Sequence, residues 1–421
     1  MARVQRPGPA RPTVPPSAAP RVDGEKSAPR AIVAVRKIFG AETPEYFLLL
    51  GTTLFLLLFG LVMVLSSSAI ESRIDDGDFF ARATRQGLYA VIGVPAMLLA
   101  ARAPTAFWKR WGGSAVVLGI VLQLLVFTPL GYGTGGNQSW LDFGAFTAQP
   151  SELIKLALVI WIPWVLVKKT GLLEDWRHVL IPIAPIVGGA VLLVLFGNDL
   201  GSASIIIMLT LGTLFFAGVR LRHLAAAVAV LAIGAAGFAT LSLSRRDRID
   251  AWLSGCTDPN QLGNECWQTV HGWEALAHGG VFGVGLGNSA GKWSWIPEAD
   301  NDFIFAIIGE ELGLLGCLLV LALFVVLAVC FVRIIRMSRD PFARIATAAV
   351  MTWIIGQAFV NIAVVIGLLP VLGVPLPLVS AGGSALLTTM AAIGIVLSFA
   401  RHRPHSLADD VTLARATRIV K

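Results

Sequence analysis

Long apolar runs are the feature that most constrains how this chain can fold. A helix needs about 20 apolar residues to cross the hydrocarbon core of a bilayer, and ten segments of that kind occur. Backbone groups in lipid must be hydrogen-bonded within the segment, so we expect helices. Only 14% of the 421 residues are charged, against about 25% in a soluble domain. The sequence therefore predicts an all-α polytopic membrane protein. Its ten expected spans are 47–67, 84–103, 112–131, 152–167, 178–197, 201–219, 222–242, 303–332, 343–368 and 376–400.

The distribution of charge predicts the orientation of the spans. If the N-terminus is cytoplasmic and the spans alternate, 25 of the 33 Lys and Arg residues fall on the inner side, but only 9 of the 26 acidic residues. Cytoplasmic loops of membrane proteins are enriched in Lys and Arg. We therefore expect both termini in the cytoplasm. The basic balance is then a topology signal and not a sign of nucleic-acid binding.

The chain divides into a membrane domain, 46–400, and two tails. Residues 1–45 are rich in Pro, Ala and Arg, a composition typical of a disordered cytoplasmic tail. Residues 401–421 form a short basic cytoplasmic tail that could weakly bind anionic lipid or a cytoplasmic partner. One large extracytoplasmic loop, about 243–302, precedes the eighth span. It holds Cys256 and Cys266, for which a disulfide, favoured outside the cytoplasm, and two free thiols are the alternatives.

Glycines and acids concentrate in this loop and at the start of the next span. The Gly-rich run 279–289 allows close backbone approach and could bind an anion through its N–H groups, or it could be a flexible loop. Asp302 stands where the polar loop meets the apolar run, so desolvation would raise its pKa toward that of a general base. Helix capping is its alternative role. Of Glu310 and Glu311, we expect one to face a polar interior and the other to pair with a cation.

Two further clusters break the apolar pattern. Pro150-Ser151-Glu152 indicates a helix start, and Lys155 lies one turn inside that span. A buried lysine needs an anion, and Glu152 and a ligand phosphate are the two candidates, which could each pair with it in a different state. The second cluster, at 370–384, is dense in Pro, Gly and Ser. Such a segment breaks a helix, which is tolerated at membrane depth only beside a cavity or within protein. We therefore expect a cavity wall there.

Motifs for other chemistries are missing from the sequence. The six histidines have no zinc-type spacing, and no phosphate-binding P-loop is found. A reaction here is therefore expected to use a substrate that is already activated.

Five motifs occur together in the order of a known family: 149–155 (QPSELIK), 199–201 (DLG), 283–292 (GVGLGNSAGK), 297–313 (from PEADNDF to EELG) and 376–384 (LPLVSAGGS). The chain resembles the SEDS family of shape, elongation, division and sporulation proteins over about residues 45–400, and its division branch most closely. The resemblance implies a peptidoglycan glycosyltransferase that polymerises lipid II. It would act at the outer face of the inner membrane, at the division septum.

The resemblance also implies roles for particular residues. Asp302 would be the catalytic base, and Lys155, with Lys292, would stabilise the leaving diphosphate. The other substrate-binding residues would be Glu152, Gln149, Ser151, Glu310, Ser380 and Ser384. The structural residues would be Gly283, Gly285, Gly287, Pro297, Gly382 and Gly383.

Cofactors and partners follow from the same resemblance. No metal site is assigned, and a divalent cation, Mg²⁺ or Mn²⁺, stays open. The implied partners are lipid II, a class B penicillin-binding protein, other divisome proteins and membrane lipid, without nucleic acid. Three alternatives remain: a lipid II flippase without chemistry, a scaffold that recruits the transpeptidase, and the polymerase of the elongation branch.

Overall fold

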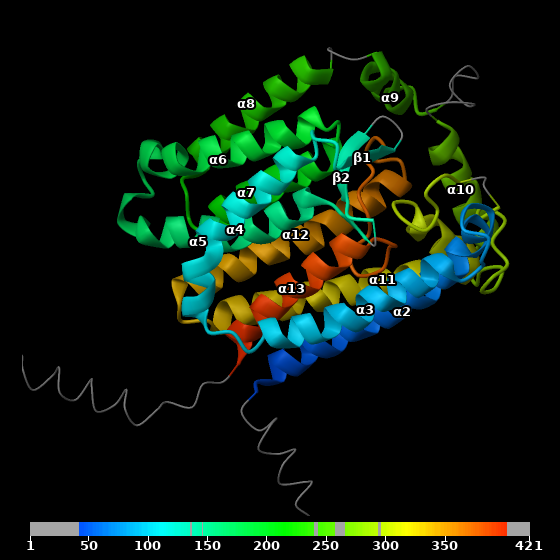
Figure 1. Cartoon of the computed structure of the whole chain (residues 1–421), viewed down its shortest axis with the longest axis horizontal. Helices are drawn as coiled ribbons and strands as arrows, with labels where there is room; N and C mark the ends of the chain where they lie inside the picture. Colours follow the sequence, from blue (N-terminus) through cyan, green and yellow to red (C-terminus); the bar gives the residue numbers. More distant parts are fainter. Residues whose placement is uncertain are drawn as a thin grey trace, which may run out of the picture. The chain divides into compact units, whose positions relative to one another are not determined.

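The computed structural model describes residues 42–401 apart from 135–136, 145, 240–242, 257–265 and 294–295, so most of both predicted tails lies outside the described residues. The described part is mainly helical (Figure 1), as predicted. The first six helices are α2 (Pro44–Asp75), α3 (Ala81–Ala100), α4 (Thr105–Leu125), α5 (Pro150–Lys168), α6 (Trp176–Phe196) and α7 (Leu200–Phe216). The other six are α8 (Leu221–Ala239), α9 (Leu243–Leu253), α10 (Trp267–Gly279), α11 (Ile304–Met337), α12 (Pro341–Val365) and α13 (Gly383–Ala400).

Each of the ten predicted spans overlaps one of these helices. Among the described residues, α2, α5, α6, α11, α12 and α13 are long and apolar enough to cross a membrane, and α7 and part of α8 are shorter apolar helices. The last span was expected from residue 376, but α13 begins only at Gly383. The prolines of 370–377 explain the difference, because proline removes a backbone donor and clashes with the preceding turn.

Four helices, α2, α6, α7 and α12, begin directly after a residue whose side chain caps the helix N-terminus. Thr43, Asp175, Asp199 and Asp340 each precede a helix and accept a hydrogen bond from a backbone N–H of its first turn. Proline occupies an early position in α2, α5 and α12. Both devices suit helix N-termini, where backbone N–H groups lack intrahelical partners.

A small antiparallel sheet between α4 and α5 was not predicted. Its strands β1 (Gly131–Thr134), β2 (Asn137–Asp142) and β3 (Thr147–Ala148) lie in that order. Tyr132 pairs with Trp140, and Leu141 pairs with Ala148. The Gln138 N–H donates to the Gly197 carbonyl oxygen at 2.9 Å. The sheet is thereby tied to the end of α6, and its last strand leads directly into α5.

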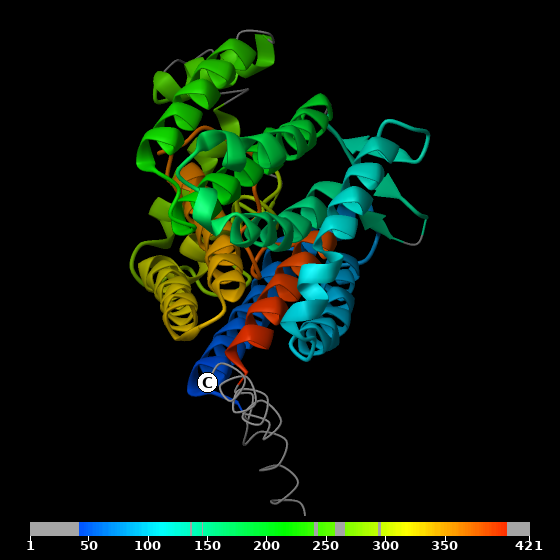
Figure 2. The same ribbon diagram turned by 90° about the vertical axis from the view of Figure 1, so that its left-hand side faces the viewer.

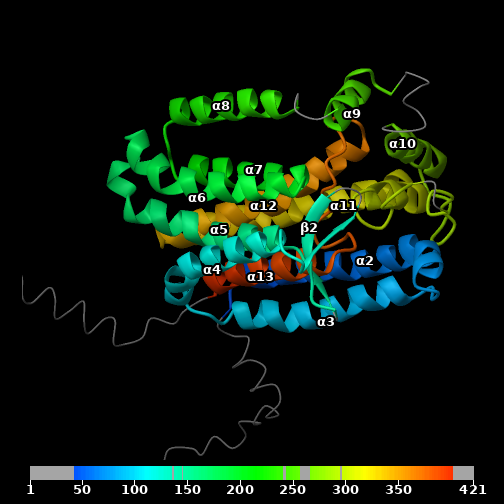
Figure 3. The ribbon, with the colours of Figure 1, turned by 45° about the horizontal axis from the view of Figure 1, so that its top comes forward.

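Within residues 42–401, the central helices pack on several neighbours. α13 packs on α3, α5 and α2, and Figure 2 shows it in red beside α2 in blue. α12 packs on α7, α11 and α5. α8 packs mainly on α7 and stands apart from the other helices in Figure 3. The site residues described below come mostly from the central helices α5, α11 and α12.

The two ends of the described chain meet. Glu42 and Arg401 form a backbone bridge and an ion pair of 2.8 Å between Oε1 and Nε. The Thr43 hydroxyl donates to the Ala400 carbonyl oxygen at 2.8 Å. The start of α2 and the end of α13 therefore lie at the same end of the helices. An even number of crossings, as in the ten predicted spans, satisfies this arrangement.

α11 is broken at Gly313, where φ is 68° and ψ is −165°. The Gly-rich loop supplies partners on both sides of the break. Val284 and Gly285 donate to the carbonyl oxygens of residues 310 and 311 at 3.0 Å each, and residues 314 and 315 donate to those of Gly280 and Val281. Backbone groups freed inside an apolar span must be satisfied. The Gly-rich loop therefore completes the backbone hydrogen bonding of α11 at its break. The N–H groups of residues 284 and 285 are used in these bonds and are not available to an anion.

Candidate active site

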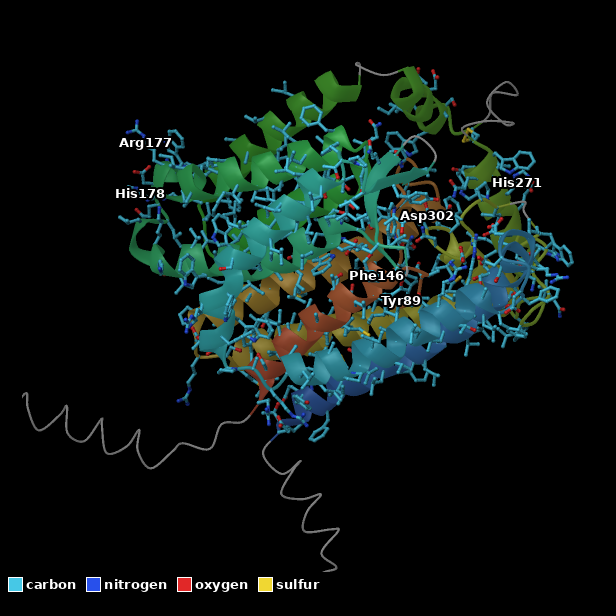
Figure 4. All side chains as sticks on the ribbon, viewed as in Figure 1. Tyr89, Phe146, Arg177, His178, His271 and Asp302 are labelled. Carbon is cyan, nitrogen blue, oxygen red and sulfur yellow. A yellow bond between two sulfur atoms is a disulfide. The ribbon has the colours of Figure 1, made fainter. Side chains whose placement is uncertain are left out.

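Asp302 lies in the turn just before α11, at the end of the helices that also carries α10 (Figure 4). It is 6% exposed, and its Oδ1 has no hydrogen-bond partner among the described residues. Burial raises the pKa of Asp302 to about 7, and the negative charges of Glu298 and Asp300 act in the same direction. The capping alternative is wrong, because Phe303 is the N-cap of α11. Asp302 is a buried acid suited to exchange a proton near neutral pH.

The segment that carries Asp302 is held by the broken segment before α13. The Ser380 hydroxyl donates to the Asn301 carbonyl oxygen at 2.5 Å, and the Ala381 N–H donates to that of Asp300 at 2.8 Å. Gly373 lies beside the carboxyl group, since a Cβ there would be 3.8 Å from Asp302 Oδ2. Ser380 thus holds the chain next to Asp302, and its predicted contact with substrate stays a prediction.

Arg82 of α3 anchors the same segment from another side. Its guanidinium lies 3.1 Å from Asp300, 2.6 Å from Glu71 and 2.7 Å from Asp75. Asp300 is buried and Asp75 is exposed. The cation therefore joins the end of α2 and the start of α3 to a residue two positions before Asp302.

Lys155 is paired with Glu152 in a buried ion pair of 2.7 Å. Of the two anions that the sequence allowed for Lys155, the structure shows the carboxylate. Lys155 Nζ also donates to Gln357 Oε1 at 3.2 Å, and Glu152 accepts from the Thr388 hydroxyl at 3.3 Å. Both charges are almost fully removed from solvent. Such a pair needs its further hydrogen bonds, because the cost of desolvation can exceed the Coulombic gain.

The start of α5 contacts both α7 and α13. The Gln149 side chain donates to Asp199 Oδ2 at 2.9 Å, and its backbone N–H donates to the Ser384 hydroxyl at 3.3 Å. The Ser151 and Ser202 hydroxyls are 3.2 Å apart. Four predicted elements of the site, around 149, 151, 199 and 384, are therefore brought together.

Glu310 lies in the polar interior that the sequence predicted for one of the paired glutamates. Its carboxylate is 3.0 Å from His278 Nδ1 and accepts hydrogen bonds from the N–H groups of Ala290 and Gly291 at 3.0 and 3.2 Å. The Ser289 hydroxyl is a further donor. Glu310 thus fixes residues 289–291 against α11, and its predicted contact with substrate stays a prediction.

Glu311 pairs with a cation, as predicted for one of the two. Lys292 Nζ is 3.5 Å from its Oε1, and the Ser66 hydroxyl of α2 is 2.7 Å from both carboxylate oxygens. Lys292 also donates to the Gly287 carbonyl oxygen. The structure therefore places Lys292 as a link between the Gly-rich loop and α11. Its predicted contact with a diphosphate stays a prediction.

A cavity of about 200 Å³ lies beside Glu310, between α10 and residues 290–291. Its polar lining is His271, Glu274, His278 and Glu310. Among the described residues, no group of three or more His, Cys, Asp or Glu side chains is placed to hold a metal ion. The divalent cation therefore stays a prediction from the resemblance.

In the segment before α10, Cys256 and Cys266 form a disulfide.

Sequence reasoning missed several polar residues that hold the site together. Gln357 and Asn361 contact Lys155 and the Asp302 segment, and Arg82 and Ser66 contact the loop before α11, through Asp300 and the Gly287 N–H respectively. A signal was present for the two amides. They lie four residues apart within the apolar run 343–368, where polar side chains are costly unless they are bonded. Arg82 gives no comparable signal, since it is one of several arginines near a span end.

The family model that matches this chain, described as "Cell cycle protein" and covering FtsW, RodA and SpoVE, spans residues 47–405. The chain belongs to this family. Among its relatives is the probable peptidoglycan glycosyltransferase FtsW of Mycobacterium tuberculosis, 38% identical over 88% of this chain and 70% of the relative. Another is the stage V sporulation protein E of Bacillus subtilis, 37% identical over 86% of this chain and 98% of the relative.

Solved structures share the fold. A chain from a study of how a peptidoglycan synthase complex coordinates polymerization and crosslinking aligns with a TM-score of 0.69, at 23% identity, over 85% of this chain and 98% of that one. The rod shape determining protein RodA of Thermus thermophilus aligns with a TM-score of 0.63, at 20% identity, over 87% of this chain and all of that one. The polytopic membrane fold predicted from the sequence is confirmed.

Proposed function

We propose that this chain is a peptidoglycan glycosyltransferase that polymerises lipid II at the outer face of the inner membrane during division. The observation that carries the proposal is Asp302, which lies just before α11. It is a buried carboxyl group with a pKa of about 7, and its Oδ1 has no hydrogen-bond partner among the described residues. The family and the names of its FtsW relatives support the same activity.

The proposed reaction is a single displacement. Asp302 takes the proton from the 4-hydroxyl group of the acceptor sugar, and that oxygen forms a bond to the anomeric carbon of the donor. The bond between this carbon and the diphosphate oxygen breaks, and the electron pair leaves with undecaprenyl diphosphate. A base with a pKa near the working pH is suited to this transfer. Inversion at the anomeric carbon follows from one displacement.

The cation that stabilises the leaving diphosphate is a separate part of the proposal. Positive charge fixed where negative charge develops lowers a barrier. Lys155 and Lys292 are the predicted cations, and both are paired with glutamates in this structure. We therefore propose that substrate binding separates at least one of these pairs. A class B penicillin-binding protein is the proposed partner, and the septum is the proposed location.

Polymerisation of purified lipid II tests the function. Wild type and Asp302→Asn are compared in detergent, each with and without the class B penicillin-binding protein of the same organism. We expect long glycan chains from the wild type and none from an equally folded variant. Transport of lipid II across a liposome membrane, with no polymer even when the partner is present, would instead establish the flippase alternative.

A further inference from the structure

Two amide side chains one turn apart on α12 connect Lys155 with the chain beside Asp302. Gln357 Oε1 accepts hydrogen bonds from Lys155 Nζ at 3.2 Å and from Trp353 Nε1 at 2.9 Å. Its Nε2 donates to the Pro375 carbonyl oxygen at 2.9 Å. Gln357 therefore holds a charged side chain with its oxygen and the main chain with its nitrogen.

Asn361 holds the neighbouring part of the same segment. Its Nδ2 donates to the carbonyl oxygens of Asp302 and Val374, both at 2.7 Å. An amide nitrogen has two N–H groups, so both are used. In the reverse orientation, the amide oxygen of Asn361 would face two carbonyl oxygens and repel both. The orientation with Nδ2 toward the carbonyl groups is therefore the correct one. Asn361 Oδ1 is then left buried without a donor among the described residues.

The carbonyl groups that these amides hold are consecutive, in Val374 and Pro375. Gly373 precedes them with φ at 66° and lies beside the Asp302 carboxyl group. Residues 370–376 have no helix or strand of their own. The placement of this stretch therefore depends on contacts with its neighbours. Gln357 and Asn361 supply two such contacts, and Asn361 binds Asp302 as well.

We propose that Gln357 and Asn361 are positioning residues, which hold Lys155 and Asp302 in register through the adjacent carbonyl groups of Val374 and Pro375. The proposal rests on Asp302 as the proposed base. Neither amide needs to touch the substrate in this role. Removal of Asn361 would free two buried carbonyl groups, loosen the Asp302 turn and admit water to its carboxyl group. Because burial is the largest cause of the raised pKa of Asp302, that pKa would fall.

Two variants test the two halves of the link. Asn361→Ala removes both donors to the main chain. Gln357→Glu keeps an oxygen for Lys155 and Trp353 but loses the donor to Pro375. The matched control is Gln123→Ala on α4, since Gln123 is as buried as Asn361 and its Oε1 also has no partner among the described residues. If Asn361→Ala does not accumulate in the membrane, Asn361→Ser replaces it, because serine cannot bond both carbonyl groups.

Rates of lipid II polymerisation are measured against pH for the protein in complex with its penicillin-binding protein. For Asn361→Ala we expect kcat to fall by about 10- to 100-fold, the order expected when a reacting group is displaced by about 1 Å. We expect KM to stay within about twofold, and the acid limb of the profile to move to lower pH. Gln357→Glu should lower kcat in the same way, and Gln123→Ala should match the wild type.

A second measurement does not depend on activity. The protonated carboxyl band of Asp302, assigned by its loss in Asp302→Asn, is followed by infrared difference spectroscopy against pH. We expect its midpoint to move to lower pH in Asn361→Ala. An unmoved midpoint and acid limb, with kcat falling only as thermal stability falls, would overturn the proposal and leave Asn361 a structural residue. An inactive wild type with a shifted midpoint would reject the proposed function while keeping the positioning role.

Discussion

Gly283 and Gly313 face each other across the break in α11, so closely that a side chain on either would collide with the backbone of the other segment. Both have positive φ values, 77° and 68°. Their contact allows the loop and the broken helix to exchange backbone hydrogen bonds. Glycine is therefore required at both positions, because the φ values are positive and because no side chain fits between the two segments.

Gly313→Ala should destabilise the protein by about 1–3 kcal/mol from the strained φ value alone, and by more through the collision with Val281. Gly283→Ala should behave alike. The measurement is thermal unfolding in detergent. Gly51→Ala in α2, where a Cβ meets open space, is the control and should leave stability unchanged or raise it by up to about 1 kcal/mol. Equal stability of all three variants would contradict the role assigned to the contact.

Asp302→Asn should abolish polymerisation and yet stabilise the protein at alkaline pH. The native pKa is about 7, above the ordinary value of 3.8, so the native state binds more protons than the unfolded state between these values. Stability therefore falls as pH rises through this window, and asparagine avoids the loss. We expect a higher Tm for the variant at pH 8 and no difference near pH 4. A lower Tm at pH 8 would show that the carboxylate is stabilised by partners other than those described.

Glu298→Gln should move the acid limb of the rate profile to lower pH. Glu298 is exposed, and after burial its charge is the largest cause that raises the pKa of Asp302. Without that charge the base is ionised at lower pH, so activity persists further into the acid range. The rate at pH 8 should change little. Glu274→Gln removes another exposed charge, on α10, and should leave the limb in place because Glu274 is not among the groups that shift the pKa of Asp302.

Lys155→Met should destabilise the protein strongly, by about 3–5 kcal/mol, because it leaves the buried Glu152 unpaired. The double variant Glu152→Gln/Lys155→Met should recover much of that stability. If Lys155 also binds the diphosphate of the substrate, the double variant stays inactive although it is folded. The measurements are thermal unfolding and polymerisation on the same preparations. Recovered activity in the double variant would restrict Lys155 to its structural pair.

The sequence was most informative where a residue is out of place in its surroundings. Asp302 at the edge of an apolar run and Lys155 inside one could both be identified, because charge at membrane depth needs a reason. The helices could be predicted because ten apolar runs have the length that a bilayer requires. For Lys155, however, two anions were equally suitable in sequence, and the structure adds only that Glu152 is close enough to pair with it.

The rest depends on contacts between segments far apart in the chain. The glycines at 283 and 285 suggested an anion site or a flexible loop, since nothing in their own sequence shows that α11 breaks opposite them. Gln357 and Asn361 stand out as polar residues in an apolar run, but the carbonyl groups of Pro375 and Val374 that they bond cannot be identified from the sequence. The same is true of Arg82, whose partners come from α2 and from the turn before α11.

The bridge between Glu42 and Arg401 places the attachment points of the two tails side by side. When two segments start from neighbouring points, a partner bound to one of them can reach the other at little cost in chain entropy. A single partner that bound one tail would thus find the other at high local concentration. Two weakly binding segments would then act as one bivalent site, and shortening either would lower the affinity for a partner that binds both.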